Sequence, residues 1–343
     1  MMIHRIILCT TFFLLFTFPC LVFSNNPTAF SPGRNIRISA IQTLQLPSNT
    51  ASTGALTFGL FNGSMYTGTI DGRILKYNKF RGTFEDFAYT SPDRTNAYCD
   101  GTTDIGRSHI CGFPKTFSTD KITGKIYVID SNLGLSEVGF SGGLATTLVP
   151  SRDGVPYHLL LGVDAATNRK VYFTDGSSIY GLKDLNVSVV TGDSSGKLLE
   201  YDTRTKVVTE LLTGLAGPAG VVSDPVASYL LVSEFTGKRI RKYYIKGPKA
   251  GTSEVILTFL GNPDVITRIK GEENFWVAVN NPSSEIPVVP LAIKFSSAGE
   301  VLAMLQLVGE FKQRITIVFQ QGNQLFVAGL NVTYIVKYNL EYS

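Results

Sequence analysis

The stretch NRKVYFTDGSSIYG, residues 168–181, is a short apolar segment that ends in an acidic residue and a Gly-Ser turn. β-Branched and aromatic residues between turn formers are typical of a short β-strand. Similar segments recur along the chain, 45 to 61 residues apart. The set comprises MYTGT from Met65, IYVID from Ile126, VYFTD from Val171, LLVSE from Leu230, FWVAV from Phe275 and LFVAG from Leu325. This recurrence predicts six copies of one strand-containing unit.

A second strand follows nearly every apolar segment, and in it apolar and charged residues alternate. Examples are RILKYN from Arg73, KLLEYD from Lys197 and YIVKYN from Tyr334. Such alternation indicates a strand with one exposed face, whereas the preceding segment is apolar on both faces. Repeats of about 40–50 residues with several strands each are typical of propeller blades. We therefore predict an all-β fold, a six-bladed β-propeller, with a β-sandwich of hairpins as the alternative.

The first 24 residues have the pattern of a secretory signal peptide. Arg5 precedes the uncharged run IILCTTFFLLFTF, and Pro19, Cys20 and a short stretch of small and apolar residues follow. The apolar run is shorter than the roughly 20 residues that a membrane span needs. We predict cleavage after Ser24 and a single propeller domain over 25–343, with an uncleaved signal anchor as the alternative.

The charge balance argues against nucleic-acid or membrane partners for the mature chain. Charged residues make up 17% of the sequence, and the formal net charge of +4 falls to +3 when Arg5 is removed. That excess is too small to indicate binding to a polyanion. The basic stretch GKRIRKYYIKGPK, residues 237–249, is interpreted as a blade strand with a solvated face.

Two pairs of cysteines and three Asn-X-Ser/Thr sequons bear on the compartment. Cys9 and Cys20 lie within the predicted signal, which leaves Cys99 and Cys111 on either side of a polar turn. In an exported chain this pair predicts one disulfide, and a reactive thiol or a zinc pair is the alternative. The predicted N-glycosylation sites are Asn62, Asn186 and Asn331.

Motifs for hydrolysis and for metal binding have plain structural interpretations. GFSGG, residues 139–143, and GDSSG, residues 192–196, match the nucleophile motif G-x-S-x-G. That motif needs a helix after the serine, whereas a strand is expected after both segments, so we interpret them as hairpin turns. Residues 25–70 contain no Asp or Glu, and calcium needs several such oxygen ligands. Asp130, Asp175 and Glu234 end apolar strands and either face the axis or cap turns. We predict neither a metal nor any other cofactor.

Long strings of the sequence resemble the plant strictosidine synthase-like family. They include GVPYHLLLGVDAATNRKVYFTDGSSIY, TGDSSGKLLEYDTRTKVVTELL, LLVSEFTGKRIRKYYIKGPKAGTSE, DGRILKY, FEDFAYTSP and NFWVAVNNP. The match covers roughly residues 54–342 and is densest over 152–280. The resemblance implies a six-bladed propeller, a Cys99–Cys111 disulfide and passage through the secretory pathway. It also implies a vacuolar destination, with the extracellular space and the endoplasmic reticulum as alternatives.

The resemblance also implies a reaction, the Pictet–Spengler condensation of tryptamine with the aldehyde secologanin. The family enzyme uses a glutamate base in its sixth-blade segment, and this chain has Gln313 or Thr316 at that place. Glu310, in a matching Gly-Glu pair, is the substitute that we consider. Because the glutamate is absent, we predict that the chain does not make strictosidine at a useful rate. The predicted pocket residues are Phe235, which matches an aromatic wall residue, Leu159 and Leu161, which replace a Trp and a Tyr, and His158.

Three classes of function remain open from the sequence. The first is a strictosidine synthase-like enzyme with an altered substrate, and the second is an ester or lactone hydrolase of the propeller type. The third is a non-catalytic binding or structural protein of the secretory pathway, for example in cell-wall or pollen-coat formation. A small-molecule ligand is expected in the central channel. A buried carboxylate at the axis favours the first class, bound calcium the second, and a closed or purely apolar axis the third.

Overall fold

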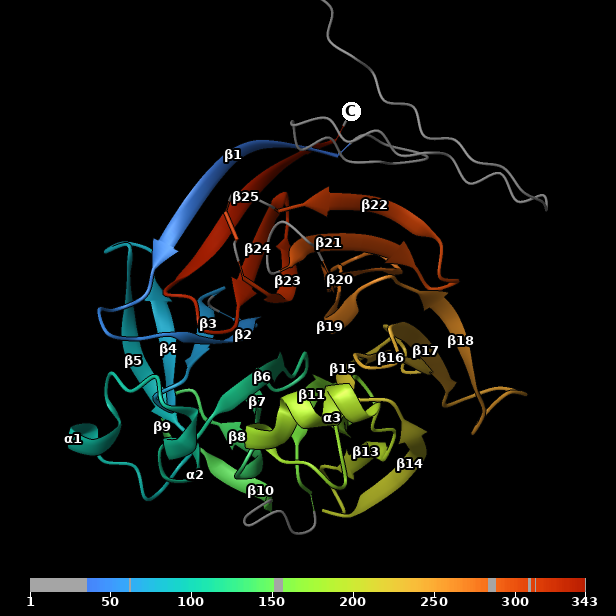
Figure 1. The fold of residues 1–343 in the computed structure, drawn as a ribbon, viewed down its shortest axis with the longest axis horizontal. Helices are drawn as coiled ribbons and strands as arrows, with labels where there is room; N and C mark the ends of the chain where they lie inside the picture. The colour runs from blue at the N-terminus through green and yellow to red at the C-terminus, as the bar shows by residue number, and fades with distance from the viewer. Residues whose placement is uncertain are drawn as a thin grey trace, which may run out of the picture.

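A computed structural model describes residues 36–61, 63–150, 157–282, 288–307, 310–311 and 313–342. Within them the strands form six antiparallel sheets of four main strands, arranged as blades around a central axis (Figure 1). The predicted all-β six-bladed propeller is confirmed. The predicted signal peptide and Asn62 lie outside the described residues, so the signal and the single domain over 25–343 stay predictions.

The first three blades are built from strands in chain order, except that β9 leaves blade 2 to join blade 1. Blade 1 contains β2 (Ser52–Phe58), β3 (Met65–Thr69), β4 (Arg73–Asn78) and β5 (Thr83–Tyr89), to which β9 (Gly143–Leu144) adds in parallel. Blade 2 contains β6 (Pro114–Thr119), β7 (Ile126–Asp130), β8 (Gly134–Val138) and β10 (Thr146–Pro150). Blade 3 contains β11 (Leu160–Ala165), β12 (Lys170–Asp175), β13 (Gly196–Asp202) and β14 (Val208–Leu215).

The remaining blades follow the same order, and the last one joins two distant parts of the chain. Blade 4 contains β15 (Pro218–Ser223), β16 (Tyr229–Glu234), β17 (Arg239–Tyr244) and β18 (Ser253–Thr258). Blade 5 contains β19 (Asn262–Arg268), β20 (Asn274–Asn281), β21 (Val289–Ser296) and β22 (Val301–Gln306). Blade 6 contains β23 (Ile315–Gln321), β24 (Gln324–Gly329) and β25 (Tyr334–Tyr342), and its outer strand is β1 (Ile36–Gln45). The antiparallel β1–β25 pair, from Ile36 with Tyr342 to Gln45 with Tyr334, therefore closes the ring.

The apolar segments of the sequence form the second strand of each blade. β3 and β7 are buried along their whole length, whereas the outer strands β14 and β18 consist mostly of exposed and partly buried positions. Neighbouring blades cover both faces of each second strand, and the main apolar clusters lie between adjacent blades. Between blades 5 and 6, for example, the buried indole of Trp276 donates a hydrogen bond of 2.7 Å to Gln320. One buried, mainly apolar strand per blade explains the spacing of the sequence repeats.

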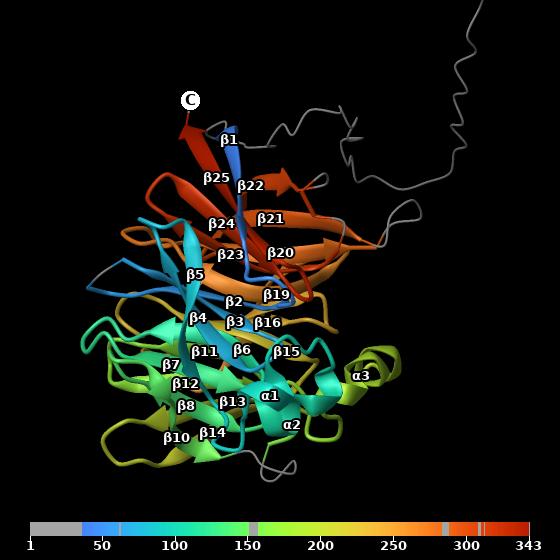
Figure 2. The same cartoon turned by 90° about the vertical axis from the view of Figure 1, so that its left-hand side faces the viewer.

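Short helices gather on one face of the disc (Figure 2). They are α1 (Asn96–Cys99), η1 (Ile105–Arg107), α2 (Ser108–Cys111), η2 (Leu182–Asp184) and α3 (Leu185–Thr191). None of the helices in the described part of the chain has the length and apolar character needed to cross a membrane.

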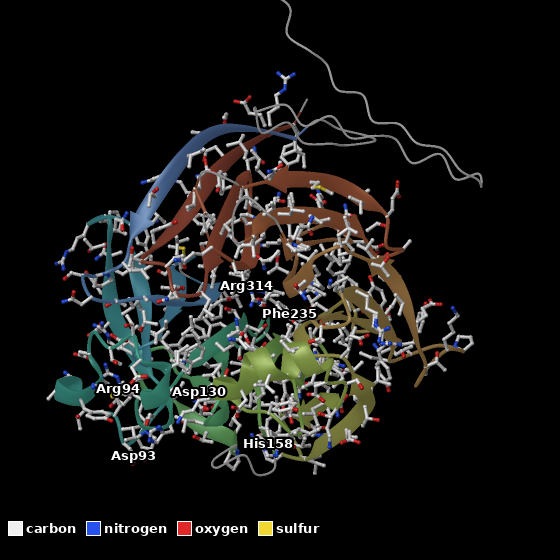
Figure 3. All side chains as sticks on the ribbon, in the orientation of Figure 1. Asp93, Arg94, Asp130, His158, Phe235 and Arg314 are labelled. Atoms are coloured by element: carbon white, nitrogen blue, oxygen red, sulfur yellow. A yellow bond between two sulfur atoms is a disulfide. The ribbon has the colours of Figure 1, made fainter. Side chains whose placement is uncertain are left out.

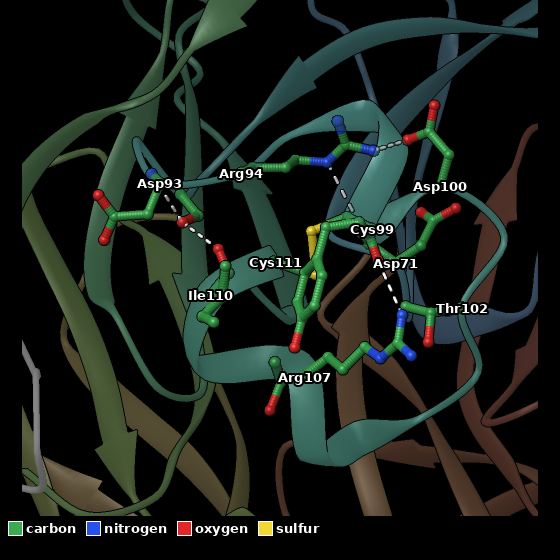
Figure 4. Close-up of a disulfide and its surroundings, with 12 residues drawn as sticks. Asp71, Asp93, Arg94, Cys99, Asp100, Thr102, Arg107, Ile110 and Cys111 are labelled. Atoms are coloured by element: carbon green, nitrogen blue, oxygen red, sulfur yellow. Dashed lines mark hydrogen bonds and ion pairs between the residues drawn. A yellow bond between two sulfur atoms is a disulfide. The ribbon is translucent and has the colours of Figure 1, made fainter.

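The predicted disulfide between Cys99 and Cys111 is confirmed. Both cysteines are fully buried, and their Cα atoms lie 5.5 Å apart. Figure 4 shows how the loop around them is held: Arg94 forms an ion pair with Asp100, and its Nε–H donates to the backbone oxygen of Asp71. The Asp71 carboxylate accepts the backbone N–H of Gly101 at 3.0 Å. The bridge therefore fixes the loop that carries η1 and α2.

Candidate functional site

A repeated irregularity in the innermost strands builds the candidate site. β2, β6, β11, β15, β19 and β23 surround the axis, and each packs against the next. Each also shifts register against its partner near its start: after Ser52, Pro114, Leu160, Pro218, Pro263 and Ile315, respectively. Bulges of this kind re-aim side chains and are common beside functional sites. In blades 2 to 6 the residue that follows the shift lines one shared cavity; these residues are Lys115, Leu161, Ala219, Asp264 and Thr316.

The cavity lies at the axis on the face that carries the helices. Its volume is about 430 Å³. Most of its wall is apolar, formed by Phe113, Leu159, Leu161, Leu182, Leu185, Val189, Phe235 and Leu330, and the disulfide-fixed loop adds Ile105. In Figure 1, α3 lies over the inner strands β11 and β15. A mainly apolar cavity with few polar groups is typical of a small-molecule site.

Four charged residues line this cavity: the exposed Lys183 and the more enclosed Lys115, Asp264 and Arg314. Lys115 and Asp264 are 7% and 4% exposed, and the Lys115 Nζ lies 4.0 Å from the Asp264 Oδ1. The second Asp264 oxygen lies 3.8 Å from an Arg314 nitrogen. The Arg314 guanidinium also stacks on Phe235, 4.4 Å from the ring centroid, and Figure 3 shows the two residues together near the axis. One carboxylate thus faces two cations.

Burial dominates the electrostatics of Lys115. Desolvation lowers the pKa of its ammonium, the Asp264 carboxylate acts to raise that pKa, and Arg314 lowers it further. Isolated buried charges are unfavourable, so such groups concentrate where a protein uses them. The buried carboxylate that the sequence analysis sought at the axis is therefore Asp264, held between two cations.

The acids at strand ends do not point to the axis but hold local turns. The Asp130 carboxylate accepts the backbone N–H groups of Phe113 at 2.6 Å and Leu133 at 3.0 Å. Glu234 is fully buried and accepts hydrogen bonds of 2.7–2.9 Å from Arg239 and Arg241. Burial acts to raise the pKa of Glu234, but these arginines and a backbone donor lower it.

Asp175 has the same local role at the end of β12. It accepts the backbone N–H of Leu159 at 3.0 Å, and burial raises its pKa. By fixing the backbone that precedes β11, Asp175 orients the leucine that lines the cavity wall. Asp130, Asp175 and Glu234 therefore hold local backbone and do not face the axis, the other role that the sequence allowed.

The axial residues do not fit a calcium ion. Calcium binds about six to eight oxygen ligands, several of them carboxylates. At the cavity the only carboxylate among the lining residues that the structure describes is Asp264, and two cations already face it. Across the described ranges no group of three or more His, Cys, Asp or Glu side chains could hold a metal ion.

The structure brings some of the predicted site residues together and separates others. Leu159, Leu161 and Phe235 line the cavity, whereas His158 is half-buried and is not among the lining residues. Figure 3 shows His158 well away from Phe235. Of the predicted glycosylation sites, Asn186 is exposed on α3 at the cavity. Asn331 is exposed in the β24–β25 turn.

Of the three positions considered for a catalytic base, one lines the cavity and two do not. Gln313 is exposed before β23, and Glu310, whose backbone oxygen accepts from Tyr334 at 2.7 Å, does not line the cavity. Thr316 lines the cavity, but its hydroxyl donates to the Gly54 oxygen at 2.9 Å. Gly54 has φ +82°, and a Cβ there would come within 1.8 Å of the Thr316 oxygen. Thr316 therefore fixes the contact between blades 6 and 1.

Lys115, Asp264 and Arg314 were missed by the sequence analysis, although a signal for two of them exists. Pro114, Pro218 and Pro263 each precede a bulged residue and stand twelve positions before the apolar segments at Ile126, Leu230 and Phe275. Proline is compatible with the first position of a strand. Reading the residue after each proline identifies Lys115 and Asp264. Arg314 has no comparable signal.

Comparison with known proteins gives consistent results. The family model for strictosidine synthase matches residues 161–248. The chain is 39% identical to strictosidine synthase-like protein 11 of Arabidopsis thaliana, with 85% of this chain and 89% of that protein covered. It is 35% identical to the strictosidine synthase of Catharanthus roseus, with 78% and 77% covered.

Solved structures with low sequence identity share the fold. A gluconolactonase from Xanthomonas campestris has a TM-score of 0.63 at 15% identity and covers 94% of this chain, and all of that chain is covered. The calcium-binding protein regucalcin from Agrobacterium tumefaciens has a TM-score of 0.61 at 13% identity, with 87% and 94% covered.

Proposed function

Because this chain belongs to the strictosidine synthase-like family, we propose that it is an enzyme that binds a small, mainly apolar organic molecule in its axial cavity. The observation that carries the proposal is a cavity of about 430 Å³ in which an apolar wall surrounds Lys115, Asp264 and Arg314. Buried charges in a cleft are costly to keep and therefore mark functional sites. A purely non-catalytic scaffold would be more stable with apolar side chains at these positions.

The reaction that we propose differs from strictosidine synthesis. Gln313 is not a base, and the Thr316 hydroxyl is engaged with the Gly54 oxygen. Two leucines replace the rings that would clamp an indole. The cavity is also lined by three basic residues, Lys115, Lys183 and Arg314, and one carboxylate, so it disfavours the ammonium form of an amine substrate such as tryptamine. Family membership therefore supports an enzyme with its site in the axial cavity. The side chains that line this cavity support a substrate other than tryptamine.

An assay with tryptamine and secologanin tests this part of the proposal. Purified protein is incubated with both substrates beside an authentic strictosidine synthase, and the product is measured by mass spectrometry. We expect no strictosidine above the level of the protein-free reaction. Strictosidine formation that Asp264→Asn or Glu310→Gln abolishes would show that one of these carboxylates replaces the family base.

A binding measurement tests the cavity itself. Ala219→Phe places a ring into the cavity from β15, and Val190→Phe is the matched control because Val190 is 87% exposed on α3. A ligand that binds the native state raises the melting temperature by mass action. We expect small apolar ligands to stabilise the wild-type protein and Val190→Phe but not Ala219→Phe. Equal stabilisation of all three proteins would place binding elsewhere.

The proposal includes passage through the secretory pathway to the vacuole. The Cys99–Cys111 disulfide supports it, because such bonds persist in oxidising compartments. The predicted signal and the exposed Asn186 and Asn331 agree with this route. Intact-mass analysis of plant-expressed protein, before and after deglycosylation, should show loss of residues 1–24 and glycan on at least one sequon. A retained Met1 and unmodified asparagines would contradict the proposal.

A calcium-dependent lactonase is the less favoured alternative. The resemblance to the gluconolactonase and to regucalcin is a resemblance of fold, at 15% and 13% identity. The donor set around Asp264 does not support the metal that this alternative requires.

A further inference from the structure

The amino group of Lys115 is unusually placed for a lysine. It enters the axial cavity from the register shift at the start of β6 and is buried on all sides except the cavity. Within the described part of the chain, its Nζ forms one ion pair, with Asp264 at 4.0 Å, which is beyond hydrogen-bond distance. A lysine in such a position retains a nitrogen atom that is free to meet a ligand.

Arg314 weakens the hold of Asp264 on the Lys115 amine, because both cations share the same carboxylate. Its nitrogen lies 3.8 Å from Asp264, and its guanidinium is fixed on the Phe235 ring. The arginine cannot lose its charge, whereas a lysine can. Desolvation together with a neighbouring cation is the arrangement that makes a lysine amine nucleophilic near neutral pH. The lowered pKa of Lys115 agrees with this expectation.

We propose that Lys115 is a catalytic nucleophile that forms a covalent imine with an aldehyde or ketone bound in the axial cavity. The inference rests on the proposed small-molecule site and adds its substrate class, an apolar carbonyl compound. Neither an amine cosubstrate nor a cofactor is needed for this step. The apolar wall holds the body of the compound, and the carbonyl carbon faces the Nζ.

The step balances with the groups that line the cavity. The Nζ lone pair attacks the carbonyl carbon, so that a C–N bond forms and the π electrons move to oxygen. Asp264 accepts a proton from the new ammonium nitrogen and returns it to the oxygen, which gives a neutral carbinolamine. The proton that the Lys115 ammonium released to solvent before the attack then returns through Asp264 to the hydroxyl oxygen, and water leaves as the nitrogen lone pair forms the C=N bond. The products are a protonated imine and one water molecule.

Reductive trapping tests the proposal. Phenylacetaldehyde, hexanal and cyclohexanone are incubated separately with the full chain and cyanoborohydride at pH 7, and the alkylated lysines are identified by peptide mass spectrometry. Lys183 is the internal reference because it lies at the same cavity but is exposed. We expect at least one probe to label Lys115 ten or more times faster than Lys183. Lys115→Arg and Lys115→Met should abolish the label at this site.

Binding of an alcohol separates the two proposals. 2-Phenylethanol has the shape of phenylacetaldehyde but no carbonyl group, and its effect on the melting temperature reports cavity binding alone. If the alcohol stabilises the protein but no probe labels Lys115 faster than Lys183, the imine is refuted and the cavity proposal stands. If the alcohol has no effect and labelling is equally unselective, both proposals fail. Selective labelling of Lys115 supports both.

Discussion

Replacing Lys115 with methionine tests whether the protein keeps this amine at a cost in stability. Methionine preserves the unbranched apolar stem of a side chain that is 7% exposed, and removes its charge. Replacing buried ion pairs with apolar residues is neutral or stabilising by about 1–4 kcal/mol. Asp264 keeps Arg314 at 3.8 Å after the substitution, so no carboxylate is left alone. We therefore expect the free energy of unfolding at pH 7 to rise by about 1 kcal/mol, the lower end of that range.

The gain should depend on pH in a defined direction. Burial lowers the pKa of Lys115 in the folded protein, below the value of about 10.4 in the unfolded chain. Between these two pKa values the unfolded state binds more protons, so the stability of the wild-type protein rises with pH. The advantage of Lys115→Met is therefore complete below the folded-state pKa and vanishes as the pH approaches about 10.4.

Urea denaturation at several pH values measures this difference. Lys183→Met is the matched control, because Lys183 lies at the same cavity but is exposed. We expect the control to change the free energy of unfolding by no more than about 0.5 kcal/mol. A loss of more than about 1 kcal/mol in Lys115→Met would refute the reasoning, because it would show that Lys115 contributes to the fold.

Three further predictions concern the scaffold. Cys111→Ser should lower the free energy of unfolding by about 3 kcal/mol in non-reducing urea titrations, whereas equal stability of the variant would show that the bridge is dispensable. Glu234→Gln should cost about 2–3 kcal/mol at pH 7, since both of its arginine partners keep some access to water. The pKa of Glu234 is lowered in the folded state, so this cost should shrink as the pH falls through that pKa. A cost that persists in acid would contradict an ionic role. The melting temperature should be the same in chelator and in millimolar calcium, and a clear rise with calcium would restore the lactonase alternative.

The fold was predictable because its repeat is local. Each apolar segment, such as the one from Val171, is a second strand that neighbouring blades cover on both faces, so burial imposes the same composition in every blade. The acid at its end caps the backbone of its own blade, as Asp175 does for Leu159. Both features depend on residues close together in the sequence.

The candidate site was less predictable because it is built between blades. Lys115 and Asp264 are 149 positions apart in the sequence, and they meet because register shifts in β6 and β19 turn both side chains to the axis. A single lysine or aspartate in a strand carries no sign of such a partner. The family resemblance directed attention to Gln313 and Thr316, where an expected glutamate is missing, and not to Lys115.

The closure of blade 6 by β1 also means that the ring can close only late in translation. The hydrogen bond between Ser39 and Asn339 joins positions 300 residues apart. At translation rates of about 5–20 residues per second, β1 is synthesised roughly 15–60 seconds before its partner strand β25. Most residues of β1 are exposed even in the finished ring, so the unpaired strand exposes little additional apolar surface during this interval. The contact between Thr316 of β23, which lines the cavity, and Gly54 of β2 accordingly forms only when the nascent chain is almost finished.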